Sequence, residues 1–418
     1  MSYFIEHARY MSFLGIICML VIAYAFSNNK SKIDFKLILN ALLMQFGMGF
    51  LILKTSVGAA VFQSISNGVG KLYLFSEDGI KFVFGALADS NGPWGLIFAV
   101  RVLPIIIFFG AFMSLLFHLR IVQKIVNFAG YVIRPLLGTS GAETVCAISN
   151  SFLGQTEAPL LIRNYLKDVT RSEMMVVMVS GFATLSGAIL VVYAAIGVPI
   201  LHLLAASMMA IPGSILMSKI LYPETEKSKT DKIMEVEPQT KNVLEALAVG
   251  TTDGMYLALN VGAMLIAFLG IIALVNGVLG SVSDVINYVL NLLHITTQLP
   301  ALSLNLIFSY LFSPFAYLLG LTGNEAILGA ELLGTKLSIN EFIAFDKMVI
   351  MDLTERSRAI LTYALCGFAN FSCIGIQIGG IGSLVPEKRT VLSELGMRAL
   401  LGATLVNFMS ALMANILL

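Results

Sequence analysis

The chain has 418 residues, of which 57% are hydrophobic and 12% charged, and its mean hydropathy is +0.87. Soluble globular domains carry about 25% charged residues, so this composition excludes a soluble globule and predicts an all-α polytopic membrane protein. The formal net charge of +1 speaks against a nucleic-acid partner, which would require a basic surface. The four cysteines and four histidines show no metal-ligand or redox spacing, so neither a metalloenzyme nor a disulfide framework is expected.

Apolar runs predict the first three transmembrane helices at residues 11–26, 37–53 and 94–117. The loop between the first two runs is rich in lysine and is therefore expected in the cytoplasm, which puts the N-terminus outside. Residues 54–93 contain no run long enough to cross, and we expect them along the outer interface. The loop after the third run is basic again, so residues 121–137 predict an amphipathic helix on the inner surface.

A polar turn with a carboxylate then interrupts the apolar sequence. Residues 144–161 are too short and too interrupted to cross a bilayer, and basic residues on the same side follow them. This pattern predicts a re-entrant hairpin. Backbone that leaves the helix at membrane depth survives only where it is buried in protein or lines a watery cavity, and an ionisable side chain there indicates a functional site. Gln155, Thr156 and Glu157 are therefore expected to face a substrate, although hydropathy alone also allows an ordinary cytoplasmic loop with a solvated Glu157.

The next elements are the fourth and fifth spans at residues 174–196 and 198–217, followed by the most polar stretch of the chain at 219–241. We expect that stretch to be a solvated cytoplasmic linker between two halves. A sixth span follows at residues 254–280, with Asp253 as its expected N-cap.

The second half of the chain repeats the first. The letters LLGTSGAE at residues 136–143 match LLGLTGNE at 318–325, and GFATLS at 181–186 matches GFANFS at 367–372, with offsets of 182 and 186 residues. Three spans separate the copies, so the second copy enters the membrane from the opposite side. Such inverted repeats are typical of secondary transporters, whose sites lie near the midplane where broken helices meet. The tip of the second hairpin is therefore expected at residues 338–342, entering from outside.

The side of the membrane from which each hairpin enters also decides which of the remaining apolar runs are counted as transmembrane helices. Residues 302–321 are apolar enough for a span, but the repeat predicts a helix in the outer interface, broken near Pro314, as the counterpart of residues 121–137. Spans seven and eight then lie at residues 359–384 and 399–418, and the C-terminus is outside. The predicted fold has eight transmembrane helices, two re-entrant hairpins and interfacial helices.

Three short motifs resemble signatures of the concentrative nucleoside transporters: GQTEAPL at residues 154–160, NEF at 340–342 and CGFANFS at 366–372. The resemblance is to the bacterial form, without the additional N-terminal spans of animal members, and it runs from the first span to the last. It implies a homotrimer in the lipids of the bacterial inner membrane, in which a scaffold holds an elevator-like transport domain in each subunit. The expected domains are a scaffold with spans one to three (1–118), a first transport-domain repeat (119–218), a linker (219–250), the sixth span of the scaffold (251–283) and a second transport-domain repeat (284–418).

The resemblance also implies roles for individual residues. The implied substrate-binding residues are Gly154, Gln155, Thr156, Glu157, Ile189, Glu341, Phe368, Asn370 and Cys373, and the implied Na⁺ ligands are Asn150, the carbonyl oxygens of Leu153 and Leu185, and the Thr184 hydroxyl. The turn from Gln155 to Glu157 would bind the nucleobase, while Glu341 and Asn370 would hold the ribose hydroxyls. The family often has a serine that contacts ribose at the position of Cys373, and a thiol is a weaker donor and acceptor.

Chemistry supports this substrate class independently. A nucleoside is neutral and rich in hydroxyl and amide edges, whereas two glutamates in one pocket would repel a phosphorylated or carboxylated solute. Several alternatives stay open on the residues alone: coupling to H⁺ through a buried glutamate, a membrane-embedded hydrolase that uses Glu157 and Glu341 as acid and base, and a passive channel. Asn150 and Asn370 could also be amides that only bridge helices.

Overall fold

The computed structural model describes residues 9–89, 92–94, 97–230, 240–295 and 298–418, and within these ranges every regular element is a helix, as predicted. In chain order the α-helices are α2 (Arg9–Ala25), α3 (Phe35–Lys54), α4 (Ser56–Phe84), α5 (Phe98–Arg101), α6 (Leu103–His118), α7 (Ile121–Leu137), α8 (Gly141–Ser149), α9 (Ala158–Leu161), α10 (Arg171–Ala183), α11 (Gly187–Ala195), α12 (Ile200–Leu221), α13 (Val243–Leu292), α14 (Leu304–Leu318), α15 (Gly323–Ser338), α16 (Glu341–Ile350), α17 (Glu355–Leu365), α18 (Phe371–Leu384) and α19 (Arg389–Leu417). Short 3-10 helices lie at η2 (Lys30–Lys32), η3 (Gly85–Ala88), η4 (Arg163–Tyr165) and η5 (Pro386–Lys388).

The apolar helices are those of a multi-pass membrane protein. Six of the described helical segments are long and apolar enough to cross a bilayer, among them α3, α12, α13 and the pair α10 and α11. The first predicted span forms α2, which is shorter at 17 residues. The predicted seventh span is divided into α17 and α18 by a non-helical segment.

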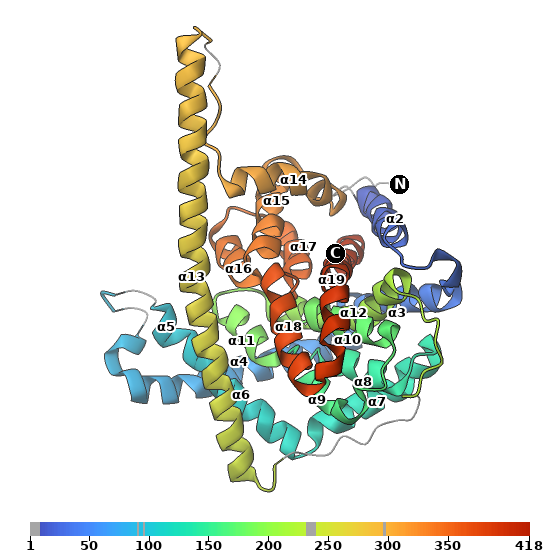
Figure 1. The fold of residues 1–418 in the computed structure, drawn as a ribbon. Coiled ribbons are helices and arrows are strands. Elements are labelled where there is room, and N and C mark those ends of the chain that lie inside the picture. The colour runs from blue at the N-terminus through green and yellow to red at the C-terminus, as the bar shows by residue number, and fades with distance from the viewer. Residues whose placement is uncertain (1–8, 90–91, 95–96, 231–239, 296–297) are drawn as a thin grey trace.

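The two hairpins enter the molecule from opposite ends, as the inverted repeat predicts. In Figure 1, α7 and α8 lie toward the lower end of the molecule, whereas α14 and α15 lie toward the upper end. The axes of α14 and α15 differ by 115°, so α14 runs across the upper end and does not continue into the hairpin as one span. The predicted break near Pro314 is wrong, because α14 continues through that residue. The turn comes at residues 319–322, where Gly320 has a φ of +89°, a conformation that favours glycine.

Both ends of the described chain lie on the same side of the molecule. The amide Nδ2 of Asn415, near the end of α19, donates a 2.7 Å hydrogen bond to the hydroxyl of Ser12, near the start of α2. The chain between Ser12 and Asn415 returns to the same side of the molecule when it passes from one side to the other an even number of times.

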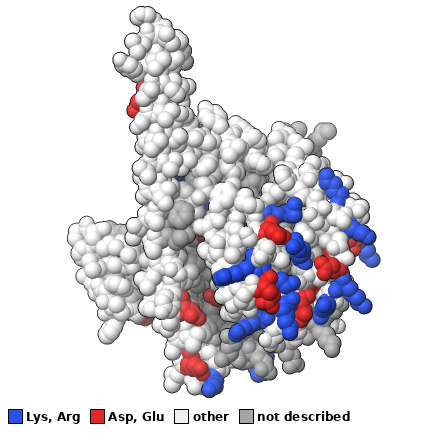
Figure 2. Space-filling model, viewed as in Figure 1, with Lys and Arg blue, Asp and Glu red and all other residues white. Residues whose placement is uncertain are grey.

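The sixth span is much longer than the sequence predicts. Helix α13 has 50 residues, and Asn242 caps it by accepting a hydrogen bond from the Glu245 amide. The prediction that Asp253 is the cap is therefore wrong, because this residue lies about three turns inside the helix. Helix α13 packs closely on α6: a Cβ built at Gly250 would lie 2.5 Å from the carbonyl oxygen of Gly110. In Figure 2 the part of α13 that stands above the rest of the molecule carries almost no charge.

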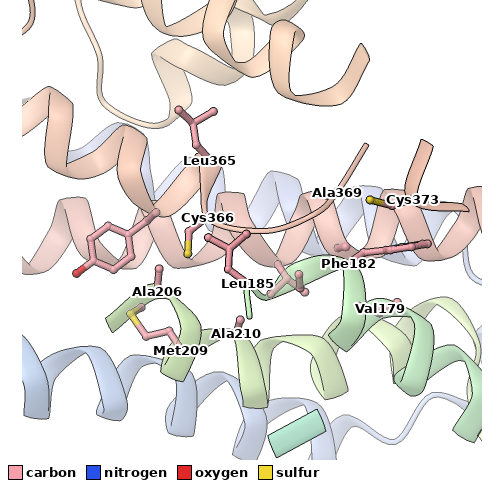
Figure 3. Close-up of a cluster of buried hydrophobic side chains, with 14 of the residues drawn as sticks. Val179, Phe182, Leu185, Ala206, Met209, Ala210, Leu365, Cys366, Ala369 and Cys373 are labelled. Atoms are coloured by element: carbon pink, nitrogen blue, oxygen red, sulfur yellow. The ribbon is translucent and has the colours of Figure 1, made fainter. Parts of the chain in front are cut away.

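The centre of the molecule is built from α10, α12, α17 and α19. Most of the residues of α10, α12 and α19 are buried. Figure 3 shows Leu185, from the break after α10, and Cys366, from the end of α17, in one apolar cluster with Ala206 and Met209 of α12. This cluster holds the broken ends of two spans against a continuous helix, so the breaks are fixed in position.

The predicted solvated linker after the fifth span is instead anchored to the protein. Lys219 still belongs to α12, is buried, and lies 2.7 Å from a carboxylate oxygen of Glu143. The hydroxyl of Thr230 donates a 2.7 Å hydrogen bond to Glu173, another buried carboxylate. Buried charges need such partners, and they hold the described part of the linker against the base of the first hairpin. Residues 231–239 of the predicted linker lie outside the described residues.

Candidate functional site

The first hairpin consists of two short helices joined by a turn-rich segment. A capping box between Ser140 and Glu143 starts α8, which ends after nine residues. Gly154 and Pro159 both disfavour a continuing helix, and the chain turns until α9 begins. Asn150 is fully buried and Gln155 is 8% exposed. The tip of the hairpin is therefore packed inside the protein at these two positions, whereas the side chain of Glu157 is exposed.

The break between α10 and α11 contacts the tip of this hairpin. Thr184 leaves the helix with an extended backbone, and the hydroxyl of Ser186 accepts a hydrogen bond from the Ile189 amide at the start of α11. The amide of Gly187 donates a 2.9 Å hydrogen bond to the carbonyl oxygen of Phe152. The first hairpin and the first broken span are therefore joined by backbone as well as by side chains.

The second repeat builds the same arrangement with asparagine caps. Asn340 accepts a hydrogen bond from the Ile343 amide and starts α16, and Asn370 accepts one from the Cys373 amide and starts α18. In the break before α18, Gly367 has a φ of +153°, and a Cβ there would lie 2.7 Å from the carbonyl oxygen of Ala183. Only glycine fits this close approach of the two broken spans.

The two hairpin tips and the two breaks, together with α13, line one cavity of about 750 Å³, within the range of small-molecule sites. All nine predicted substrate-binding residues line this cavity: Gly154, Gln155, Thr156, Glu157, Ile189, Glu341, Phe368, Asn370 and Cys373. The structure therefore brings together residues that are more than 180 positions apart in the sequence. A smaller cavity shares Glu157 and continues between α6 and α13 toward Phe117 and Thr240.

Glu341 is held in a defined orientation at the start of α16. The phenolic hydroxyl of Tyr193 donates a 2.8 Å hydrogen bond to one carboxylate oxygen, and Asn370 Nδ2 donates a 3.2 Å hydrogen bond to the other. The side chain is 5% exposed, yet it lines the cavity. A carboxylate has about four lone-pair sites, so Glu341 retains acceptor capacity for hydroxyl groups of a ligand.

The first hairpin contributes an amide and a second carboxylate to the cavity. The amide Nε2 of Gln155 donates to the sulfur of Cys373 at 3.4 Å, which joins the first hairpin to the second repeat. The carbonyl oxygen of the Gln155 side chain is buried and has no hydrogen-bond partner among the described residues. Glu157 accepts a 3.2 Å hydrogen bond from the Gly154 amide. Buried polar atoms are normally satisfied, so the unpaired oxygen of Gln155 marks a position where a ligand donor would fit.

Several residues that line the cavity were missed from the sequence, among them three with polar side chains that bear on the site. Tyr193 orients Glu341, and Asp253 and Asn260 face the cavity from α13. The last two are seven residues apart, which is about two helical turns and therefore one helix face. That spacing was a usable signal, whereas nothing local distinguishes Tyr193 from an ordinary aromatic residue in an apolar span.

Two of the predicted Na⁺ ligands, Asn150 and Thr184, are in contact where α8 and α10 end. The hydroxyl of Thr184 donates a 2.9 Å hydrogen bond to the carbonyl oxygen of Asn150, and the Asn150 amide donates a 2.9 Å bond to the Ser180 hydroxyl. The side-chain oxygen of Asn150 is buried without a hydrogen-bond partner in the described chain. Helix C-termini carry partial negative charge, and Na⁺ as a hard cation prefers oxygen ligands. The oxygen-rich donor set and the unpaired Asn150 oxygen therefore fit such an ion.

Two oppositely oriented hairpins and two broken helices around one central cavity define an inverted-repeat secondary transporter. Comparison with known families agrees with this class. The description "Na+ dependent nucleoside transporter" matches residues 14–87 as its N-terminus and residues 202–415 as its C-terminus. A third description, "Nucleoside recognition", matches residues 99–199. The chain belongs to the family of concentrative nucleoside transporters.

Similar proteins extend over nearly the whole chain. An uncharacterized transporter of Haemophilus influenzae is 43% identical, and the nucleoside permease NupC of Helicobacter pylori is 39% identical, each over 97% of both chains. The rat sodium/nucleoside cotransporter 1 is 36% identical over 97% of this chain and 63% of its own length.

Solved structures of CNTnw have the same fold. Its inward-facing substrate-bound state gives a TM-score of 0.90 at 35% identity, with 97% of this chain and 98% of that chain covered. A variant in an outward-facing state also gives a TM-score of 0.90 at 34% identity, with 98% and 97% covered.

Proposed function

We propose that this chain is a symporter that couples inward flow of Na⁺ to the uptake of uridine-like nucleosides. The observation that carries the proposal is the single cavity lined by all nine predicted residues from both repeats. Gln155, Thr156 and Glu157 bind the nucleobase, with Ile189 against its face. Glu341 and Asn370 hold the ribose hydroxyls, and Phe368 shapes the pocket.

The chemistry of the cavity favours a neutral solute rich in hydroxyl groups. Glu341 and Glu157 offer carboxylate acceptors from the two hairpins, and Gln155 offers an unpaired amide oxygen. A phosphorylated or carboxylated solute would meet like charge from both carboxylates, which is most unfavourable at Glu341, because that side chain is buried. A nucleoside instead donates hydroxyl and amide hydrogens to these acceptors. Hydrogen bonds to charged groups each contribute about 1.5–3 kcal/mol.

The position of the proposed ion ligands supports sodium coupling. Asn150 directly precedes the tip that carries Gln155, and Thr184 lies in the break bonded to that tip. Na⁺ bound to the carbonyl oxygens of Leu153 and Leu185 and to these two side chains fixes the turn before the nucleobase arrives. The nucleoside then binds a preorganised site and loses less conformational entropy on binding.

Transport proceeds by movement of the two hairpin repeats against a scaffold that includes α6 and α13. The glycine contacts hold these two helices together, and the outer faces of α13 are strongly apolar: Ile266 is 79% exposed and Leu274 is 68% exposed. Apolar surface of this extent on a single chain marks lipid or protein contacts, and in a homotrimer α13 packs against the other subunits. The protein lies in the bacterial inner membrane with both termini outside.

Uptake into vesicles that contain the purified protein tests the proposal. A Na⁺ gradient should drive labelled uridine above its external concentration, and the label should be recovered as unchanged uridine. Uptake driven only by a pH gradient would assign the coupling to H⁺ instead. Equilibration without accumulation would indicate a passive channel, and a chemically altered product would indicate an enzyme. The matched control is Asp346→Asn, which removes a carboxylate of the second hairpin that does not line the cavity, and it should leave uptake unchanged.

A further inference from the structure

A buried lysine lies next to the proposed nucleoside site without any role in it. Lys336 is on α15, five residues before Glu341, and is 3% exposed. Its ammonium donates a 2.9 Å hydrogen bond to the carbonyl oxygen of Ala364 and a 2.6 Å hydrogen bond to the side-chain oxygen of Asn407. Both acceptors are uncharged. A buried cation is expensive unless its surroundings compensate it, and inside a membrane it indicates function by default.

The partners of Lys336 connect the two broken spans. Ala364 lies in the last turn of α17, so its carbonyl oxygen belongs to the negative end of that helix. Asn407, on the continuous helix α19, donates a 2.7 Å hydrogen bond to the carbonyl oxygen of Cys366 and a 2.8 Å hydrogen bond to that of Ala183. Cys366 directly follows α17, and Ala183 directly precedes Thr184 of the proposed Na⁺ site. The ammonium therefore sits at one end of a hydrogen-bond chain that reaches the ion site of the first repeat.

Lys336 lies within about one helical turn of the position that the repeat assigns to Asn150, the proposed sodium ligand of the first half. The offset of 186 residues that relates the two broken spans carries Asn150 to Lys336 and Ser180 to Cys366, whereas the offset of 182 that relates the starts of the hairpins carries Asn150 to Leu332, about one helical turn earlier. In the first half, Asn150 bonds the end of α10 through Ser180. In the second half, Lys336 bonds the end of α17 through Ala364, two residues before Cys366. Each hairpin thus brings one polar side chain to the C-terminal end of the broken helix that it faces.

We propose that Lys336 is a built-in cation: its ammonium occupies, in the second repeat, the position where the first repeat binds a mobile Na⁺. Lys336 is then a positioning residue, which neutralises the C-terminal end of α17 and holds the second hairpin in the geometry that presents Glu341 to ribose. Because the lysine permanently fills this position, the chain carries one mobile Na⁺ with each nucleoside and not two. This inference rests on the proposed Na⁺-coupled function and deepens it.

The number of Na⁺ ions linked to uridine binding tests the proposal. The uridine dissociation constant is measured by calorimetry over a series of Na⁺ concentrations, with choline holding the ionic strength constant. The logarithm of this constant is plotted against the logarithm of the Na⁺ concentration. The magnitude of the slope gives the number of Na⁺ ions bound with each uridine. The wild type should give about one, because the linkage between two ligands is reciprocal. Lys336→Asn, which gives position 336 the side chain of position 150, should open the second site and give a slope of about two. Its uridine affinity should fall roughly tenfold at low Na⁺ and recover at high Na⁺.

Further variants separate this role from simple structural damage. Lys336→Ser also leaves room for an ion and should behave like Lys336→Asn, whereas Lys336→Arg keeps the charge and should keep a slope of about one. The matched control is Lys347→Asn on the other arm of the hairpin, where the ammonium pairs with Glu331 at 2.9 Å; it should keep both slope and affinity.

The outcomes distinguish this inference from the proposed function. A wild-type slope of zero contradicts Na⁺ coupling itself. A wild-type slope of one that persists in Lys336→Asn and Lys336→Ser overturns the built-in cation alone. Failure of both variants to fold at any Na⁺ concentration also overturns it, because the proposal requires that a mobile ion can replace the ammonium; folding only with Na⁺ present supports it.

Discussion

Replacement of Glu341 by glutamine tests the ribose half of the site most directly. Glutamine keeps the size of the side chain and one carbonyl oxygen, which can still accept a hydrogen bond from Tyr193 or Asn370. It removes the charge and one acceptor, so a ribose hydroxyl loses a charge-assisted partner. Such a bond contributes about 1.5–3 kcal/mol, and each 1.4 kcal/mol is about tenfold in affinity. The uridine dissociation constant should therefore rise roughly 10- to 150-fold.

Thermal unfolding of the purified protein with and without uridine measures this loss. At a uridine concentration about 100 times the wild-type dissociation constant, binding stabilises the native state by about 2.7 kcal/mol. For a variant that binds 100-fold more weakly, the same concentration gives only about 0.4 kcal/mol. The matched control is Glu325→Gln at the far end of the same hairpin, where the carboxylate accepts hydrogen bonds from Thr354 and Ser357. It should retain the full uridine shift, and a full shift in Glu341→Gln as well would refute the ribose assignment.

Three further substitutions test other parts of the site. Tyr193→Phe removes the 2.8 Å hydrogen bond to Glu341. Calorimetry should show uridine binding that is about tenfold weaker, with the same dependence on Na⁺. An unchanged affinity would show that the hydroxyl does not orient the carboxylate. Asn150→Leu removes the unpaired oxygen at the proposed ion site and should abolish the stabilisation of the protein by Na⁺ in thermal unfolding. If Na⁺ still stabilised the variant, the assignment of Asn150 to the ion site would be wrong. Cys373→Ser supplies a stronger hydrogen-bond partner near Gln155 and should improve uridine affinity a few-fold; weaker binding would mean that the thiol is the better fit.

The sequence itself determined the class, the repeat and most of the cavity. Composition alone required a membrane protein, and basic loops required alternate sidedness. The turn at residues 154–157 and the NEF motif at 340–342 were recognisable because glycine, asparagine and carboxylates interrupt long apolar runs, and such residues at membrane depth must line a cavity or be buried in protein. The resemblance to a known family then named the remaining predicted substrate-binding residues, and all nine predicted residues line one cavity.

The tertiary structure alone decided the partners of the charged and polar groups. Asp253 was interpreted as a helix cap because it preceded an apolar run, but α13 begins ten residues earlier and turns this side chain to the cavity. Lys219 was assigned to a solvated linker, yet it is buried against Glu143. Lys336 and Tyr193 gave no signal, because their partners Asn407 and Glu341 are 71 and 148 residues away in the sequence. Hydrophobic periodicity reports which face of a segment is apolar, which is a local property. Whether a buried charge is compensated depends on groups that only the folded chain brings within hydrogen-bond distance.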